Sequence, residues 1–436
     1  SIWITPASVP YSHRYRICLY NSGTLYNTWT FFDNYVDTSD GKNGRGPQKT
    51  LYDVDGNSLT LTSSSAQIVS SDSDGISMED SLPVHTQKLT LEILSELSSG
   101  TYTFEDPLII QNPYEITPLT ALIAFETEIS CQVRITVKGK TASADRTDLL
   151  DAASTHLVPV LGLYPDSENH ILLELLDKSG TAFKTQELTL QTEKLPEYLR
   201  TAVKTGSYTA ASSMDLMLIS GLGTPYLYAF DEFGDIRWYC TLEREYYGGF
   251  PLENGHILTE SPDVLFPNAS MPNSPEFVEI DWLGRAYRLY SFPEGVHHEI
   301  KEKTPDGNLL IASSSNDGYE QNLIQEIDRE TGAVVKSLCL NDVFEGLEYI
   351  SQDDWCHINT LSYDEKTDSI LVSCRNLHSV IRINWSTDEI QWILGDPLLW
   401  EGTSWESKVL APASDFSWHY QQHSAYELSQ DLDGDL

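Results

Sequence analysis

The chain has 436 residues, which is long enough for two or three domains that each bury a core. Its 65 acidic residues against 27 basic ones leave a formal charge of -38, which repels nucleic acid and anionic membranes, so we expect neither as a partner. No run of 18 apolar residues occurs and Ser1–Pro6 lacks the regions of a signal peptide, so we expect no membrane insertion and no export signal in this sequence.

Residues 1–105 match no pattern that we can place, and we leave this region unassigned as strands and loops. It contains a hairpin-like segment, Tyr15–Tyr26, and a stretch rich in Ser, Asp and Gly over residues 41–80 that we interpret as loop with weak strands. Throughout the chain, short β-branched and aromatic runs alternate with Gly, Asn, Asp and Ser, and helical periodicity is nearly absent. The predicted fold class is therefore all-β.

Residues 106–195 have the pattern of a small β-sandwich domain. The predicted strands are Ala121–Phe125, Gln132–Val137, His156–Val160 and Asn169–Leu175. A different pattern follows, which we assign to a second domain at residues 196–436.

From about Gly206 onward, a short strand followed by a hairpin recurs, and each hairpin turn begins with an acidic or amide residue. These turn residues, at intervals of 50, 47 and 56 residues, are Asp231, Asp281, Asp328 and Asn384. A repeat of this length, made of short antiparallel strands, is typical of β-propeller blades. Four blades can be counted and a fifth begins at Trp418. We therefore expect that blades are missing after Leu436 or that N-terminal strands, with Tyr15–Tyr26 as the candidate, close the propeller.

The segments Trp355–Asp364 and Asp368–Arg375 have the pattern of two strands joined by an acidic turn. Alternate side chains of a strand share one face, so we expect His357 and Asn359 to point the same way and the hairpin to bring Arg375 beside them. An imidazole, an amide and a guanidinium that converge form a site for a sulfuryl, phosphoryl or carboxylate group. A polar strand end without a function is the alternative.

Two other histidine sites fall at corresponding places in the repeat. One is the adjacent pair His297 and His298, and the other is His423. Equivalent inner-strand positions of a propeller converge on its central channel, so His298, His357 and His423 could meet around one pocket. For each of them, a hydrogen-bonded structural histidine is the alternative.

Several segments together resemble the bacterial aryl-sulfate sulfotransferases, the enzymes that do not use the nucleotide sulfate donor. The resemblance covers about residues 108–436, and its motifs appear in the family's order. The segments that carry it are Asn112–Tyr114, Pro118–Leu122, Pro159–Tyr164, Val296–Ile300, Asp354–Arg375, Ile390–Gly395 and Gln421–Ala425. The resemblance implies a six-bladed β-propeller after a small β-sandwich, and a propeller that this chain, ending at Leu436, would leave incomplete.

The resemblance also implies a ping-pong transfer of a sulfuryl group from an aryl sulfate to a phenol. By position, His423 matches the nucleophile that becomes a sulfohistidine, and His357 and Arg375 match the residues that hold the sulfuryl oxygens. The catalytic candidates are His423, His357, Arg375 and His298, and the substrate-binding candidates are Asn359 and His297. Whether His298 or His357 protonates the leaving phenolate stays open, because either imidazole could do so.

The partners implied are a small-molecule aryl sulfate donor and a phenolic acceptor, whose physiological identities the sequence leaves open. We expect no cofactor, an extracytoplasmic (periplasmic or secreted) location by resemblance to the family, and a homodimer as one assembly to test. The six cysteines are scattered without a Cys-x-x-Cys pair, which argues against a disulfide framework or a structural zinc site.

Other readings compete with this one. A catalytic metal site is the first, because clustered histidines bind zinc or iron, but we expect no metal ligands here. Residues 419–423 superficially resemble a metalloprotease helix, but Tyr420 stands where the general-base glutamate belongs. The sulfatase motif has its nearest match in Cys240–Arg244, where Leu242 replaces the required Pro or Ser, and no phosphate-binding loop for a nucleotide sulfate occurs. A noncatalytic ligand-binding propeller and an aryl sulfate hydrolase that uses the same site stay open.

Overall fold

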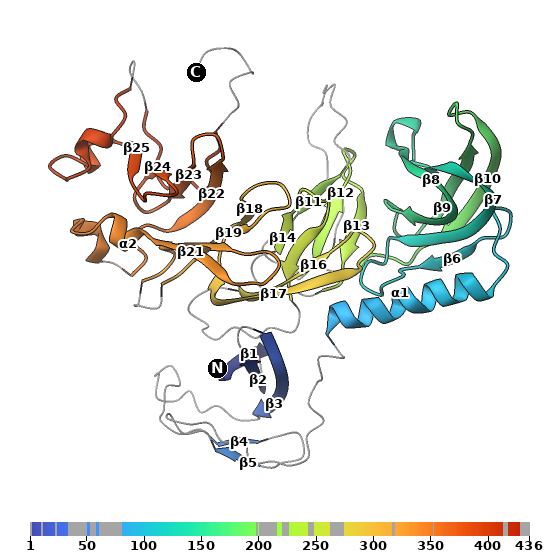
Figure 1. Ribbon diagram of the computed structural model, residues 1–436, viewed down its shortest axis with the longest axis horizontal. Helices are drawn as coiled ribbons and strands as arrows, with labels where there is room; N and C mark the ends of the chain where they lie inside the picture. The colour runs from blue at the N-terminus through green and yellow to red at the C-terminus, as the bar shows by residue number, and fades with distance from the viewer. Residues whose placement is uncertain are drawn as a thin grey trace.

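The computed structural model describes residues 81–197, 199, 216–219, 226–242, 248–261, 274–315, 319–351, 353–412 and 417–427, together with the backbone of five strands between residues 2 and 60. Antiparallel strands dominate these residues, and Figure 1 shows them as a series of separate sheets along the chain. The predicted all-β class is confirmed.

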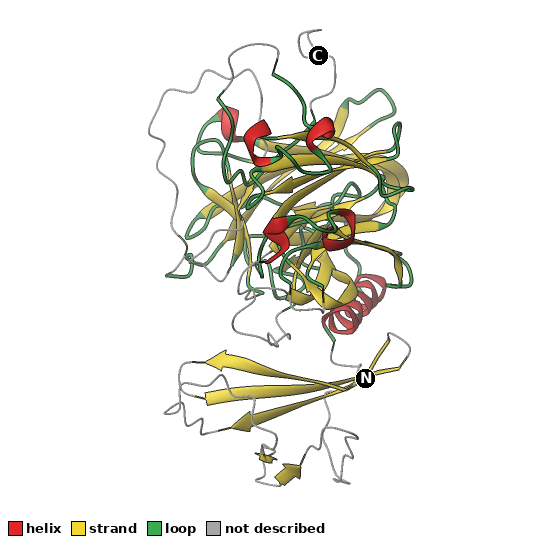
Figure 2. Cartoon of the chain, turned by 90° about the vertical axis from the view of Figure 1, so that its left-hand side faces the viewer, coloured by secondary structure: helices red, strands yellow, loops and turns green. Residues whose placement is uncertain are grey.

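The N-terminal strands form sheets of their own. Strands β1 (Ile2–Val9), β2 (Ser12–Asn21) and β3 (Thr24–Asp33) pair antiparallel in chain order, and β4 (Thr50–Tyr52) pairs with β5 (Ser58–Thr60). The expected hairpin is present as β2 and β3, but it pairs with β1 and not with a propeller strand, so the prediction that it closes the propeller is wrong for the described strands. Figures 1 and 2 both show this sheet set apart from the rest. The loop predicted over residues 41–80 lies largely outside the described residues.

Helix α1 (Leu82–Ser99) is an element that the sequence analysis missed. Pro83 lies in its first turn, and its buried residues Thr86, Ile93 and Leu97 fall on one face. The Thr86 Oγ1 atom donates to the Ala286 carbonyl oxygen at 3.0 Å and accepts from the Ala286 N–H at 3.1 Å, which fixes the helix against a propeller strand. The helical period is hidden in the sequence because further leucines of this helix are exposed to solvent.

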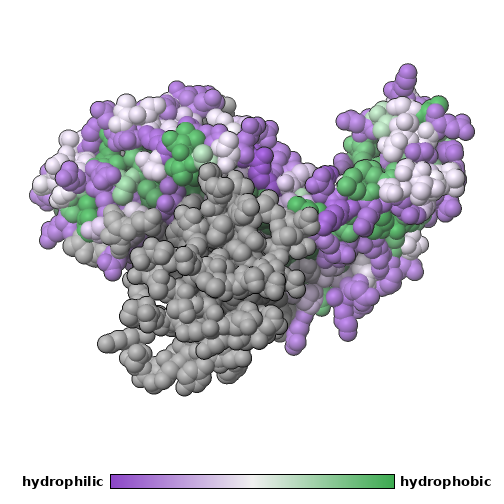
Figure 3. Space-filling model, turned by 60° about the horizontal axis from the view of Figure 1, so that its bottom comes forward, coloured by the Kyte–Doolittle hydropathy of each residue, from purple (hydrophilic) through white to green (hydrophobic). Residues whose placement is uncertain are grey.

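The described helices include none that combines the length and apolarity of a bilayer-spanning segment. Hydrophilic side chains predominate in the described part of the face drawn in Figure 3, and the hydrophobic ones there form separate groups.

The small β-domain is a five-stranded antiparallel sheet built around two long strands. Its strands are β6 (Leu108–Gln111), β7 (Ala121–Val137), β8 (Arg146–Val160), β9 (Glu168–Leu176) and β10 (Ala182–Gln191). The segments predicted as two strands, 121–125 and 132–137, are one strand whose pairing with β8 shifts register between Glu126 and Val133. The first part of β7 pairs with β6 and the last part with β9, and the apolar side chains between them form a core.

The buried side chain of Arg237, which belongs to the first propeller sheet, contacts the small β-domain and pairs with Asp231 of its own sheet. Arg237 and Asp231 are 2.8 Å apart between Nη1 and Oδ2, and both side chains are fully buried. The Arg237 Nε atom donates to the Gly162 carbonyl oxygen at 2.8 Å, and its guanidinium lies 3.7 Å from the centre of the Tyr164 ring. Because one side chain satisfies partners in both domains, it fixes how they pack.

The propeller region consists of up-and-down antiparallel sheets. The first sheet has β11 (Met217–Ile219), β12 (Leu227–Phe230) and β13 (Ile236–Cys240). The second has β14 (Gly248–Pro251), β15 (Ile257–Glu260), β16 (Ser274–Ile280) and β17 (Ala286–Val296). The third has β18 (Ile300–Glu302), β19 (Leu309–Ser313), β20 (Leu323–Ile327) and β21 (Val334–Cys339), and the fourth has β22 (Ile358–Asp364), β23 (Ser369–Cys374), β24 (Ser379–Asn384) and β25 (Ile390–Leu394). Each hydrophobic core lies between neighbouring sheets, as the packing of propeller blades requires. A short helix, α2 (Leu340–Val343), follows the third sheet.

The predicted turn residues are confirmed in all four sheets. Each one closes the last hairpin of its sheet, and its side-chain oxygen accepts a backbone N–H two or three residues further on. The distances from the accepting oxygen are 3.0 Å for Asp231, 2.9 Å for Asp281, 2.7 Å for Asp328 and 2.9 Å for Asn384. This side-chain mimicry of a backbone turn explains why Asp and Asn recur there.

The chain end differs from the prediction. Residues 417–427, where a fifth blade was expected to begin at Trp418, run as irregular backbone without a strand. The number of six blades stays a prediction, as do the domain boundaries at residues 106–195 and 196–436.

Candidate functional site

The structure brings together His298, His357 and His423. The ring centres of His298 and His357 lie 5.0 Å apart, and that of His423 lies 5.4 Å from each of the other two. His298 precedes β18, His357 precedes β22, and His423 lies in the irregular segment 417–427. Two adjacent blades and the chain that follows them therefore contribute one imidazole each.

The first two histidines occupy equivalent and strained backbone positions. His298 has a φ of 52° and His357 a φ of 53°, the left-handed region that few residues other than glycine adopt. Left-handed residues that are not glycine gather at functional sites, where the surrounding structure holds them in place. In each case the turn ends just before the first strand of a blade and directs the imidazole toward its neighbours.

The expected alternation of His357 and Asn359 along one strand is wrong. Strand β22 begins only at Ile358, and its pairing with β23 shifts register between Ile358 and Thr360, so Asn359 lies in a β-bulge. Its side chain is 4% exposed. The hairpin does bring Arg375 beside His357, because the Arg375 N–H donates to the His357 carbonyl oxygen at 3.0 Å.

A hydrogen-bonded chain connects His357 to Arg375 through two residues that the sequence analysis did not single out. The His357 Nδ1 atom lies 2.7 Å from Asp354 Oδ2. The Asn376 amide donates to the Asp354 backbone oxygen at 2.5 Å and to its Oδ2 at 3.2 Å, and Asn376 Oδ1 accepts from Arg375 Nη1 at 2.7 Å. The spacing of three residues between Asp354 and His357, and a polar residue directly after Arg375, were the available signals.

His298 is held from behind by His297. The His297 Nε2 atom lies 2.9 Å from the Ser313 carbonyl oxygen, and because a carbonyl only accepts, this nitrogen carries the proton. The neutral His297 ring then accepts at Nδ1 from His298 Nδ1, 3.1 Å away. This tautomer, inferred from the hydrogen bonds, puts the lone pair of His298 on Nε2. His297 is fully buried, behind the cluster.

The electrostatics favour the neutral forms of His297, His298 and His423. Burial, together with the neighbouring His298, lowers the pKa of His297 to about 3. Burial, together with His357 and His423, lowers the pKa of His298 to about 4. The pKa of His423 is also lowered, first by burial and then by His357 and Arg375, although the residue is exposed overall. Near neutral pH, His298 and His423 are therefore uncharged.

The segment that carries His423 is docked onto β22, β23 and β24. Asn359 Nδ2 donates to the Gln422 carbonyl oxygen at 2.8 Å. The Gln422 side chain donates to the carbonyl oxygens of Cys374 at 3.0 Å and Ser379 at 2.9 Å. The Gln421 N–H donates to His378 Nδ1 at 3.0 Å. These bonds position His423 although its segment has no strand.

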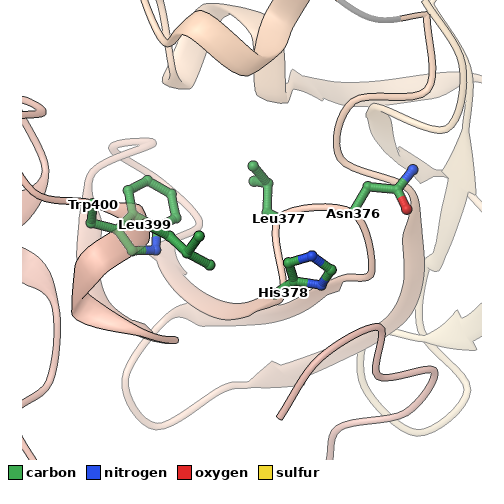
Figure 4. Close-up of a pocket in the computed structure, with 5 residues that line it drawn as sticks. All are labelled: Asn376, Leu377, His378, Leu399 and Trp400. Carbon is green, nitrogen blue, oxygen red and sulfur yellow. The ribbon is translucent and has the colours of Figure 1, made fainter. Parts of the chain in front are cut away.

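A small pocket of about 90 Å³ lies beside this site. Figure 4 shows its lining, in which Asn376, Leu377 and His378 come from the turn between β23 and β24, and Leu399 and Trp400 face them. None of the three clustered histidines lines it.

The three histidines are also the described residues best placed to hold a metal ion. One ring nitrogen from each lies within 4.8 Å of the other two.

The five cysteines among the described residues are free thiols. The burial of Cys240 raises the pKa of its thiol to about 12, so this thiol is not a nucleophile near neutral pH.

Comparison with known sequences decides the family. A sequence model described as Arylsulfotransferase (ASST) matches residues 201–434, more than half of the chain. The chain belongs to the arylsulfotransferase family. A second model, described as Arylsulfotransferase Ig-like domain, matches residues 108–193, which hold β6 to β10. All candidate residues of the site lie within the first match.

Two proteins named arylsulfate sulfotransferase AssT are similar to this arylsulfotransferase. The protein from Escherichia coli O6:H1 is 22% identical over 438 residues, covering 74% of this chain and 72% of that protein. The protein from Lelliottia amnigena is also 22% identical over 438 residues, covering 73% and 71%. Among solved structures, AztD from Citrobacter koseri is 11% identical and covers 80% of this chain and 91% of that chain, with a TM-score of 0.25. Family membership supports sulfuryl transfer between aryl groups as the coarse activity.

Proposed function

We propose that this arylsulfotransferase moves a sulfuryl group from an aryl sulfate ester to a phenol through a sulfohistidine on His423, without a nucleotide sulfate donor. The observation that carries the proposal is the convergence of His298, His357 and His423, with ring centres 5.0 to 5.4 Å apart, next to Arg375. A nucleophile, a proton carrier and a cationic oxyanion holder are the groups that such a transfer requires.

His423 is the proposed nucleophile because it is neutral and accessible. Its lowered pKa leaves the lone pair available near neutral pH, and its exposed position lets an aryl sulfate approach. The bonds that Asn359 and Gln422 make around it hold the segment in place. We therefore assign Asn359 to positioning the nucleophile and not to direct contact with substrate.

His357 is the proposed proton carrier. The Asp354 carboxylate, 2.7 Å from Nδ1, fixes the tautomer and faces the positive charge that His357 bears once Nε2 takes a proton. His298 is less suited to this role because its pKa of about 4 leaves it unprotonated near neutral pH. We assign His298, with the buried His297 behind it, to shaping the site around the sulfuryl group.

In the first half-reaction, the His423 ring nitrogen attacks the sulfur and the bond from sulfur to the aryl oxygen breaks. The leaving phenolate takes the proton from protonated His357. In the second half-reaction, the acceptor phenol gives its proton to His357 and its oxygen attacks the sulfur, which breaks the N–S bond. The proton and the sulfuryl group are each passed on once, so His423 and His357 return to their starting states.

Arg375 is proposed to hold the sulfuryl oxygens as they gain charge. The hydrogen bond from its Nη1 to Asn376 limits the positions that the guanidinium can take. Asn376 also contacts Asp354, so one amide supports both Arg375 and the partner of His357. We assign Asp354 and Asn376 as positioning residues.

The test is release of 4-nitrophenol from 4-nitrophenyl sulfate by the wild-type chain, with and without phenol. Release that depends on phenol supports transfer. Release without an acceptor would instead support the hydrolase, which the exposed His423 also allows, and absence of release in both assays would support a binding module.

The mechanism is tested by His423→Ala, with His170→Ala as the matched control, because His170 is an exposed histidine of the Ig-like domain. We expect His423→Ala to abolish both transfer and the acid-labile sulfuryl adduct seen by mass spectrometry, and the control to keep both. Ordinary transfer by the His423 variant would overturn the sulfohistidine.

The proposed location is extracytoplasmic, as the family resemblance implies, and the proposed assembly to test is a homodimer. Fractionation of the natural host and sedimentation of the purified chain would check them.

A further inference from the structure

We infer that the cluster of His298, His357 and His423 also binds a divalent transition-metal cation such as Zn²⁺, and that the bound cation blocks sulfuryl transfer. The binding site follows from the geometry of the cluster alone. The inhibition rests on the proposed function, because only then do the same three imidazoles form the reaction centre.

The donor atoms are suited to such a cation. Three imidazoles, each with one nitrogen within 4.8 Å of the other two, are a set typical of zinc sites that keep one coordination position open. Nitrogen ligands favour Zn²⁺ or Cu²⁺ over Mg²⁺ and Ca²⁺, which require oxygen ligands. The inference is therefore specific to the class of transition metals.

The hydrogen bonds already fix two of the three rings in the form that a metal needs. The Nδ1 atom of His357 faces Asp354 at 2.7 Å, and the Nδ1 atom of His298 faces His297 at 3.1 Å. In the neutral form of both rings this arrangement puts the proton on Nδ1 and the lone pair on Nε2, so metal binding displaces the Nε2 proton that His357 carries in the transfer cycle. A carboxylate behind a ligating histidine, as Asp354 stands behind His357, is the usual support of a zinc ligand.

The charges around the cluster favour a cation on balance. The Asp354 carboxylate lies 2.7 Å from His357 Nδ1 and is close enough to influence His298 as well, and the carboxylate of Glu320 lies near His357. Arg375 acts in the opposite direction, since it lies near His423. The formal charge of -38 adds a long-range attraction.

Binding requires only a small adjustment. A tetrahedral zinc ion with bonds of about 2.0 to 2.1 Å sets its ligand nitrogens roughly 3.3 Å apart. His423 can supply this movement by rotating its side chain, which is exposed, while its segment stays docked. The fourth position then faces solvent, where a water molecule or a substrate oxygen can bind.

The binding test uses the full chain after treatment with a chelator, titrated with ZnCl₂ by calorimetry and with CoCl₂ by visible absorption. We expect about one equivalent to bind with a spectrum of tetrahedral cobalt. His298→Ala, His357→Ala and His423→Ala should each weaken binding at least about tenfold, and Asp354→Asn by roughly 10-fold to 100-fold, as a lost outer-shell partner typically does. His170→Ala should bind as the wild type does. Circular dichroism identifies variants that fail to fold.

Absence of binding, or binding that none of the cluster substitutions weakens, would overturn the metal site. For the inhibition, nitrophenol release in the presence of phenol should fall as ZnCl₂ is added, return after EDTA, and require more zinc when the aryl sulfate concentration is raised. Binding without inhibition in an active enzyme would overturn the inhibitory role. Because calorimetry needs no turnover, a chain that binds zinc but transfers no sulfuryl group would refute the proposed function and leave the metal site standing.

Discussion

Two arginine-centred hydrogen-bond networks of this arylsulfotransferase contain similar residues but differ in how far they are exposed to solvent. At the contact between the small β-domain and the first propeller sheet, Arg237 and Asp231 are both fully buried. Beside the histidine cluster, Arg375 is only partly buried and connects through Asn376 to Asp354, whose side chain is 32% exposed. The first network faces only protein, and the second faces solvent on one side.

The difference teaches how a structural arginine and a functional one can be told apart. Removal of a partner from a buried ion pair costs stability, since the remaining charge has no water to solvate it. A partly exposed arginine can be solvated after such a loss, so its removal should affect binding and catalysis more than folding. Substitutions at Arg237 should therefore change the free energy of unfolding, and substitutions at Arg375 should change the rate of sulfuryl transfer.

The largest expected effect is on stability, from Arg237→Met. This variant leaves Asp231 buried without its partner, and we expect it to lower the free energy of unfolding by about 3 to 5 kcal/mol, measured by chemical denaturation. Adding Asp231→Asn should recover part of the loss, because an amide oxygen can still accept the N–H of Phe233 that Asp231 accepts at 3.0 Å. A double variant as unstable as the single one would contradict this account.

The next effect is on catalysis, from Arg375→Ala. Loss of one preorganised donor to a developing oxyanion typically reduces the rate about 10²- to 10³-fold, equivalent to about 3 to 4 kcal/mol in the barrier, and we expect a fall of this size in kcat. The free energy of unfolding should change by less than about 1 kcal/mol. Arg375→Lys should be intermediate, because an ammonium cannot form the bidentate contact. A large loss of stability without loss of rate would show that Arg375 has a structural role, as Arg237 does.

A smaller effect is expected from Asp354→Asn, which tests the residue that connects His357 to Asn376 in the second network. Asparagine keeps the shape but removes the charge that faces His357, so we expect kcat to fall roughly 10- to 100-fold with KM little changed. A change in KM alone would show that Asp354 only shapes the pocket.

This network also marks how far the sequence could predict the site. The turn residues were predictable because an Asp or Asn side chain closes a turn locally, and His298 and His357 because the repeat places them at equivalent positions. His423 lies in a segment without a strand, and the family resemblance is what singled it out. Asp354 and Asn376 were not predicted, since their roles depend on the left-handed turn at His357 and on pairing across β22 and β23. The β-bulge at Asn359 was not predicted for the same reason, because the register between two strands is a tertiary property.

The smallest predicted effect compares Asp231 with a second buried carboxyl group, Glu299. Asp231 has its arginine, whereas the side chain of Glu299 is 13% exposed and its charged neighbour, Lys301, is 3.9 Å away. Burial therefore raises the pKa of Glu299 to about 7, with Lys301 opposing the shift. Between about pH 4.5 and 7 the folded protein holds this proton and the unfolded chain does not, so the contribution of Glu299 to stability is lost as the pH rises.

Glu299→Gln removes this titration while keeping the shape of the side chain. The variant should gain stability relative to the wild type on going from about pH 5 to about pH 8, by on the order of 1 to 2 kcal/mol, as measured by chemical denaturation at each pH. His297 and His298 also titrate differently in the folded and unfolded states, but they do so in both proteins and cancel in the difference. A difference that stays constant across this range would mean that Glu299 is solvated, like the partly exposed Asp354, in spite of its burial.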